Sequence, residues 1–150
     1  QSCFCADLVF RKFDVSQWEL MKGPEAKLWE KLRVKLPQVF WTRIENTASS
    51  GIPDVYGAHE NKSFFVELKV TKSNKVRLSP TQISWNYSNV YNGGRSFYLV
   101  EALSTSSLYL FSGKKGRELQ KEGLKSGPLA TFHAPLDANQ LLHSLKTAPL

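Results

Sequence analysis

Residues 63–70, SFFVELKV, form the strongest strand pattern in the sequence and limit what the rest of the chain can fold into. Side chains alternate between the two faces of a strand, which gathers four apolar side chains on one face: Phe64, Val66, Leu68 and Val70. The other face carries Phe65, Glu67 and Lys69. An apolar strand face must be covered by another layer, so the pattern predicts a sheet packed against helices. Folding alone does not explain the charged pair on the other face.

The segments around this strand alternate between helix-like and strand-like patterns. We expect helices in residues 23–37 and 78–92, strands in 38–46, 52–60, 95–103 and 106–113, and helical segments in 114–127 and 138–146. Gly57 is expected to break its strand, and the Gly93-Gly94 pair to stop the preceding helix. With 150 residues, the chain is predicted to be one mixed α/β domain with a small central sheet flanked by helices.

Asp54 lies on the second expected strand, which precedes residues 63–70 in a hairpin, and it offers a partner for the charged face. It follows Pro53, which limits ladder pairing and so favours a bend that brings the Asp54 side chain toward Glu67. Two carboxylates and a backbone carbonyl such as that of Leu68 are the oxygen ligands that Mg²⁺ prefers, and a lysine beside them can act on a water or a phosphate. The alternative is a solvated sheet face with a weak charge pair.

The expected helices 23–37 and 78–92 each carry a polar residue that is a candidate for the same site as Asp54 and Glu67. Glu25 falls in the middle of the apolar stripe of the first helix, whereas Glu30 projects away from it. Glu25 can also act simply by stabilising the helix dipole. Gln82 is expected to complete a capping box with Ser79, yet its side chain can still point toward the strand ends.

A succession of short motifs carries a resemblance to a known family. The motifs are PEAKLWEKL (24–32), SSGIPDVYG (49–57), FFVELKV (64–70) and LSPTQISW (78–85), and a gap of 12 residues separates Asp54 from Glu67-Leu68-Lys69. This arrangement resembles the PD-(D/E)XK nuclease superfamily, and is most similar to its VRR-NUC and Holliday-junction-resolvase-like branch. The resemblance implies a restriction-endonuclease-like αβββαβ core in about residues 24–112, with 1–20 and 114–150 as peripheral extensions.

The resemblance also implies an activity and a role for each site residue. The activity is that of an endonuclease that hydrolyses DNA phosphodiester bonds with Mg²⁺, for which Mn²⁺ would substitute. Its substrate would be a junction or flap, or a specific site as in homing and restriction enzymes. Asp54, Glu67, Glu25 and the Leu68 carbonyl would hold the metal, with Glu30 as the alternative to Glu25. Lys69 would orient the attacking water, and Gln82 would support Lys69 or contact the scissile phosphate.

The charge balance favours a polyanionic partner such as DNA. Twenty basic residues against 13 acidic ones give a net charge of +7. The residues expected to follow a nucleic-acid backbone are Lys72, Lys75, Arg77, Lys62, Arg43 and Arg95. The alternative for the loop 71–77 is plain solvation. A second basic stretch, 114–125, is expected to be an exposed helix, and Trp85, Tyr87 and Tyr91 are expected to pack rather than to stack on bases.

The cysteine content and the apolar runs of the sequence bear on where the protein is found. Two cysteines, Cys3 and Cys5, read as reduced thiols and predict a cytoplasmic protein, in the host cytoplasm if the chain is viral. No apolar run is long enough to cross a membrane. A homo-oligomer is possible, with PLDANQLLHSL (135–145) as its contact. The rival functions are a non-catalytic nucleic-acid-binding module of the same fold, and an interaction domain in which Asp54 and Glu67 lie far apart.

Overall fold

A computed structural model describes residues 23–44 and 51–150 of the chain. The predictions for residues 1–20, including the state of Cys3 and Cys5, and for most of the turn at 47–51 lie outside the described residues. In chain order the elements are α3 (Glu25–Lys35), β1 (Phe40–Arg43), β2 (Val55–His59), β3 (Lys62–Thr71), α4 (Pro80–Tyr91), β4 (Ser96–Ala102), β5 (Ser107–Ser112), η1 (Gly113–Lys115), α5 (Gly116–Glu122), η2 (Gly123–Lys125), β6 (Ala130–His133) and α6 (Ala138–Thr147).

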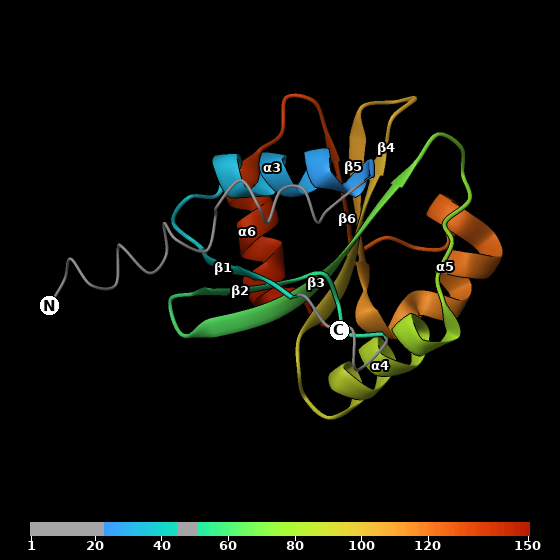
Figure 1. The fold of residues 1–150 in the computed structure, drawn as a ribbon, viewed down its shortest axis with the longest axis horizontal. Helices are drawn as coiled ribbons and strands as arrows, with labels where there is room; N and C mark the ends of the chain where they lie inside the picture. The colour runs from blue at the N-terminus through green and yellow to red at the C-terminus, as the bar shows by residue number, and fades with distance from the viewer. Residues whose placement is uncertain (1–22, 45–50) are drawn as a thin grey trace, which may run out of the picture.

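The strands form one mixed, mostly antiparallel sheet with the spatial order β1-β2-β3-β4-β5-β6. Among the described strands only β3 and β4 pair in parallel, and α4 is the crossover between them. The elements from α3 to β4 therefore follow the predicted order αβββαβ, and the predicted α/β fold class is confirmed. This arrangement puts β3, the strand that carries Glu67 and Lys69, near the middle of the sheet (Figure 1).

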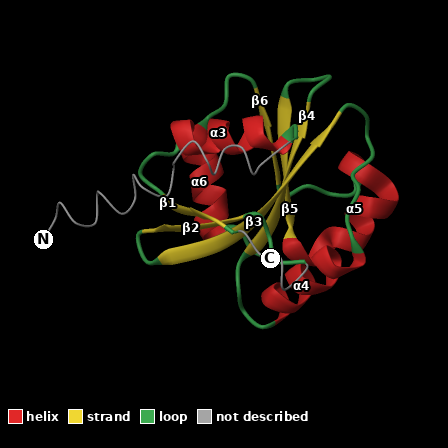
Figure 2. Cartoon of the chain, viewed as in Figure 1, coloured by secondary structure: helices red, strands yellow, loops and turns green. Residues whose placement is uncertain are grey.

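Helices cover the sheet in two groups, α3 with α6 and α4 with α5 (Figure 2). The larger core lies between the sheet and α3 and α6, and includes Leu28, Trp29, Leu32, Phe64, Val66, Leu68, Phe97, Leu99, Leu110, Leu141 and Leu145. A second, smaller core joins the sheet to α4 and α5, and includes Val76, Leu78, Tyr98, Val100, Phe111, Leu119 and Leu124. The predicted apolar face of residues 63–70 therefore meets the larger core, and Glu67 points to the other side.

The last helix is part of the larger core. Leu141, Leu142 and Leu145 of α6 are buried against the sheet, as their i, i+1, i+4 spacing allows. The prediction that residues 135–145 form an oligomer contact is therefore wrong for these leucines, because they pack within their own chain. The segment 114–150, expected to be peripheral, supplies one of the two helices on this face.

Two local details of the strands differ from the sequence-based expectation. Gly57 does not break β2, which pairs through it with Phe64 of β3. A Cβ atom at Gly57 would lie 2.5 Å from the Phe64 ring and 2.9 Å from the Trp41 ring, so the glycine makes room for aromatic packing. Strand β6 was not expected, because it is short and pairs only as an edge strand with β5.

The helix α4 begins as predicted. Ser79 is the N-cap, its hydroxyl accepts a hydrogen bond from the Gln82 N–H, and the Gln82 side chain accepts one from the Ser79 N–H. Pro80 occupies the first helical position. The capping box fixes the orientation of Gln82 at the N-terminus of α4, close to β3. In the ranges 23–44 and 51–150, no helix is both long enough and apolar enough to cross a membrane.

Candidate active site

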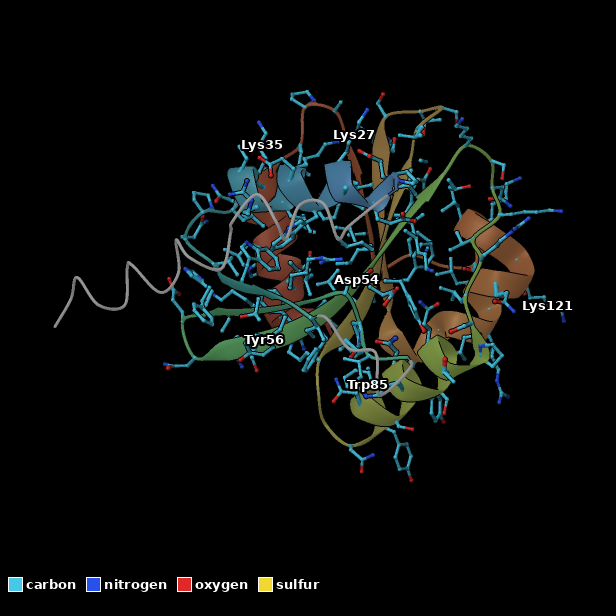
Figure 3. All side chains as sticks on the ribbon, in the orientation of Figure 1. Lys27, Lys35, Asp54, Tyr56, Trp85 and Lys121 are labelled. Carbon is cyan, nitrogen blue, oxygen red and sulfur yellow. The ribbon has the colours of Figure 1, made fainter. Side chains whose placement is uncertain are left out.

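The bend before β2 and the middle of β3 bring the two predicted carboxylates together. Asp54 lies at the bend, and its Oδ2 accepts a hydrogen bond of 2.8 Å from the Leu68 N–H. The next residue along the chain from Asp54, Val55, pairs with Val66. Because Leu68 directly follows Glu67, this bond places the Asp54 carboxylate close enough to that of Glu67 for the two charges to interact. Figure 3 shows Asp54 at the centre of the molecule.

Glu67 is almost completely buried, with 3% of its surface exposed. Its Oε1 accepts a hydrogen bond of 2.9 Å from Gln82 Nε2 and lies 3.9 Å from Lys69 Nζ. Its Oε2 is buried and has no hydrogen-bond partner among the described residues. Burying a carboxylate oxygen without a partner is costly, so Oε2 marks a place where a positive charge or a donor would be strongly bound.

Burial changes the pKa values of both Asp54 and Glu67. Loss of solvation and, after it, the nearby Asp54 carboxylate raise the pKa of Glu67 to about 9, although Lys69 acts in the opposite direction. Burial likewise raises the pKa of Asp54, although the Leu68 N–H, Glu67 and Lys69 all favour its charged form. The protein on its own therefore does not supply enough positive charge to hold both groups as carboxylates.

This pKa shift predicts that the metal-free protein loses stability as the pH rises. Between the usual pKa of Glu67, 4.5, and about 9, the folded state binds more protons than the unfolded state, so the free energy of unfolding falls across that range. The total loss is on the order of a few kcal/mol. Urea unfolding in EDTA at pH 5, 7 and 9 measures it. A free energy of unfolding that does not change with pH would contradict the raised pKa of Glu67.

Glu25 lies near this pair but does not complete a three-carboxylate cluster. It lines a pocket of about 390 Å³ with Lys69 and with the residues of the loop after β3. Its charge raises the pKa of Asp54, so the two carboxylates are within electrostatic reach. However, across residues 23–44 and 51–150 no three His, Cys, Asp or Glu side chains gather closely enough to hold a metal ion. The predicted ligation by Glu25 stays a prediction. Glu30, its alternative, bonds to Arg33 on the same helix.

The basic loop after β3 is held in a defined shape. The Thr71 hydroxyl donates to the Lys75 carbonyl at 2.8 Å and accepts from the Ser73 N–H at 3.1 Å. Asn74 ties the loop to α5 and η2, because its Oδ1 accepts from the Leu124 N–H at 3.0 Å. These bonds fix the backbone, so the exposed cations of the loop are presented along the pocket that contains Lys69: Lys72, Lys75 and Arg77.

The other predicted nucleic-acid contacts do not join this pocket. Lys62 lies at the β2–β3 hairpin, at the opposite end of β3 from Lys69. Arg43 lies on β1, at the edge of the sheet. Arg95 has a different role from the predicted one: its guanidinium donates to the carbonyls of Ser144, Leu145 and Ala148. It therefore caps the C-terminus of α6, where a cation also stabilises the helix dipole.

Two buried residues that bond to Gln82 were not predicted as part of the site from the sequence. Tyr98 of β4 pairs with Glu67 in the parallel register, and its hydroxyl donates to the Gln82 carbonyl at 3.3 Å. Asn86, fully buried on α4, donates to the same carbonyl at 2.8 Å. The Tyr98 bond ties the first turn of α4 to β4, and the Asn86 bond lies within α4, so both hold the Gln82 backbone in place. The strand register that brings Tyr98 beside Glu67 leaves no signal in the sequence.

Comparison with known proteins gives a likeness in structure and none in sequence. The sequence matches none of the protein-family models, and no curated protein matches it significantly. The structure is similar to that of Hjc, a Holliday junction resolvase from the archaeal hyperthermophile Archaeoglobus fulgidus. The two share 16% identity and a TM-score of 0.48, over 59% of this chain and 76% of Hjc. A likeness of this size assigns neither a family nor an activity to the chain.

Proposed function

We propose that this protein is a metal-dependent endonuclease that hydrolyses phosphodiester bonds in DNA, and that it belongs to the PD-(D/E)XK superfamily. The observation that carries the proposal is the convergence of Asp54 and Glu67 beside Lys69, with a partnerless buried oxygen on Glu67. The alternative in which the two carboxylates lie far apart is contradicted by their interaction and by the burial of Glu67.

The residues present fit a divalent cation. Two neighbouring carboxylates with raised pKa values, one with a buried oxygen that lacks a partner, form a site whose charge is not compensated. Mg²⁺ keeps several water ligands and commonly binds through one or two carboxylates, so a third protein carboxylate is not required. Asp54 and Glu67 would hold the ion, together with the Leu68 carbonyl. Mn²⁺, which also prefers oxygen ligands, would substitute.

Each side chain has a distinct task in the proposed reaction. A bound divalent cation stabilises charge on the phosphate and makes a bound water more acidic. The Lys69 ammonium lines the pocket and would orient the attacking water or neutralise a phosphate oxygen. Gln82 holds the Glu67 carboxylate in one orientation from its capped position on α4. Lys72, Lys75 and Arg77 would bind the DNA backbone without reading its sequence.

A non-catalytic nucleic-acid-binding module of the same fold is the second candidate. The same basic loop favours it, because cations on a fixed backbone would bind DNA whether or not the carboxylates cut it. The two candidates differ in one respect. The nuclease needs Asp54, Glu67 and Lys69 to cleave DNA, whereas the module binds DNA without them.

A cleavage assay on a panel of DNA substrates separates the two candidates. The panel contains a linear duplex, a single strand, a splayed flap and a four-way junction, each incubated with Mg²⁺, Mn²⁺ or EDTA. We expect cleavage with either metal and none in EDTA. Preference for the junction or flap would indicate a structure-selective enzyme of the VRR-NUC or resolvase type, and cutting of only certain duplex sequences a homing or restriction type. Binding without cleavage of any substrate, including a random-sequence duplex library, would favour the module.

A further inference from the structure

A groove runs between α4 and the segment η1–α5, on the side of α4 that faces away from β3. Its volume is about 520 Å³, and its lining combines apolar, hydroxyl and charged side chains: Pro80, Ile83, Ser84, Tyr87, Ser88, Lys114, Arg117 and Glu118. The base of the groove is tightly packed, because a Cβ atom at Gly116 would lie 3.1 Å from Ile83 Cγ1 and 2.6 Å from the Tyr98 hydroxyl. The two walls are therefore held at a fixed separation.

Two tyrosines on α4 form an exposed aromatic surface: Tyr87 lines the groove, and Tyr91, which does not line it, lies beside Tyr87. Tyr87 is 52% exposed and Tyr91 is 78% exposed, although both are large apolar side chains. Their rings are nearly parallel, with an angle of 14° between the planes and 6.2 Å between the centroids. The spacing of four residues puts Tyr91 on the same side of the helix as Tyr87. The expectation that these tyrosines pack into a core is wrong, because both are exposed. Packing against a partner stays a prediction.

The opposite wall is basic. Residues 113–125 contain five cations and two acids, which gives this short segment a net charge of +3. Lys114 and Arg117 line the groove, and Lys121 follows Arg117 by one helical turn and projects outward on α5 (Figure 3). Within the described residues, none of the three takes part in an ion pair. Their charge is therefore available to an anionic ligand.

The groove is joined to the candidate active site through shared elements. It begins at Pro80, in the same helical turn as Gln82, which bonds to Glu67. Gln120 of α5 accepts a hydrogen bond of 3.0 Å from the Leu78 N–H, just before α4. The basic loop after β3 runs beside α5 toward α4 (Figure 1), and Asn74 bonds it to η2. A nucleic-acid strand that lies along this basic loop can therefore continue into the groove.

We propose that the α4–α5 groove binds a single-stranded segment of nucleic acid, whose bases stack on Tyr87 and Tyr91 and whose phosphates contact Lys114 and Arg117. Exposed aromatic rings beside a basic wall are the combination that binds single strands without sequence preference, because every base has a face that can stack. A double helix keeps its bases stacked on one another and would leave the tyrosines unused. The groove adds a second contact to the proposed nuclease, and its binding does not require cleavage.

Fluorescence anisotropy with a labelled 20-nucleotide oligo(dT), measured in EDTA over a series of salt concentrations, tests the groove. We expect Tyr87→Ala and Tyr91→Ala each to weaken binding about five- to fifty-fold. Tyr87→Phe and Tyr91→Phe, which keep the rings, should bind within about two-fold of the original protein. Arg117→Ala should weaken binding and reduce the salt dependence by about 0.7 in the slope of log K against log[salt].

Two exposed lysines of α3, Lys27 and Lys35, provide matched controls. Lys27→Ala and Lys35→Ala change the net charge as Arg117→Ala does, but they lie on α3, away from the groove (Figure 3). They should leave oligo(dT) binding within about two-fold. Equal losses in the Lys35→Ala and Arg117→Ala variants would overturn the proposal. So would a loss with Arg117→Ala and none with either tyrosine variant, because the groove would then hold any polyanion, an acidic protein included.

The oligo(dT) binding test can succeed or fail independently of the cleavage assay that tests the proposed nuclease. If the substrate panel shows no cleavage but the tyrosine and arginine variants lose oligo(dT) binding, the groove is established and the nuclease is not. If cleavage occurs but the groove variants bind oligo(dT) like the original protein, the groove proposal fails and the nuclease stands. Circular dichroism of each variant confirms that a loss of binding does not come from unfolding.

Discussion

Replacing Glu67 by glutamine is expected to abolish cleavage and to make the metal-free protein more stable. Glutamine keeps the size and one carbonyl oxygen of Glu67 but removes a carboxylate that would hold the cation. Losing a metal ligand removes several kcal/mol of transition-state stabilisation, which corresponds to a rate loss of about a thousand-fold or more. At pH 8 the metal-free protein must take up a proton on Glu67 when it folds, because burial raises the pKa of that group to about 9. Glutamine avoids this cost, so we expect the unfolding temperature in EDTA at pH 8 to rise by a few degrees.

Glu101 is the matched control for this substitution. It is also a buried glutamate, 8% exposed, on the neighbouring strand β4, but it forms an ion pair with Lys31 of α3. Glu101→Gln breaks a satisfied pair and should lower stability, while cleavage changes by less than about three-fold. The measurements are single-turnover cleavage rates and thermal unfolding in EDTA and in Mg²⁺. If Glu67→Gln lowered stability as Glu101→Gln does and kept its activity, Glu67 would be a structural residue.

Replacing Lys69 by methionine is expected to slow the chemical step by a factor of about 10² to 10⁴, with the fold intact. Methionine keeps most of the length and the apolar stem of lysine, so packing beside Glu67 is retained. Only the ammonium group is lost, and it lies 3.9 Å from Glu67 Oε1. Because the carboxylates remain, divalent cations should still bind and raise the unfolding temperature. Single-turnover rates at saturating enzyme isolate the chemical step from DNA binding.

Lys72 provides the contrast, since it lines the same pocket from the loop after β3. Lys72→Met should weaken DNA binding, with the salt dependence of duplex affinity reduced by about 0.9 in the log–log slope. Its effect should fall mainly on the dissociation constant, whereas that of Lys69→Met should fall mainly on the rate at saturation. If Lys69→Met and Lys72→Met both lowered only the affinity for DNA, Lys69 would be one more contact to the DNA backbone. That result would favour the non-catalytic module.

The parts of the fold that depend on local chemistry could be predicted from the sequence. The capping box of α4 involves only residues 79–82, so its partners are visible in the sequence, and the structure has it as expected. The alternation in residues 63–70 likewise predicted which face of β3 is buried and which carries Glu67 and Lys69. Both predictions rest on interactions between neighbours in the chain, for which spacing is sufficient.

The parts that depend on distant pairing could not be predicted. Tyr98 supports Glu67 only through the parallel register of β3 and β4, which the length and docking of α4 determine. Arg95 caps a helix 49 to 53 residues further along the chain, so its sequence position suggested a surface cation instead. Gly57 reads as a strand breaker until the rings of Trp41 and Phe64 are placed against it. In each case the partner is chosen by tertiary packing.

The packing of α6 on the sheet makes the proposed chemistry depend on a segment that is synthesised after every proposed catalytic residue. Residues 138–147 cover the same strand, β3, whose opposite face carries Glu67 and Lys69. A nascent chain that has exposed all of residues 24–112 outside the ribosome holds every proposed catalytic side chain but lacks half of the helical cover over β3. Domains fold as units during translation, so such a chain cannot yet fix the spacing of its carboxylates. The proposed enzyme would become competent to cut nucleic acid only after its α6 segment has emerged.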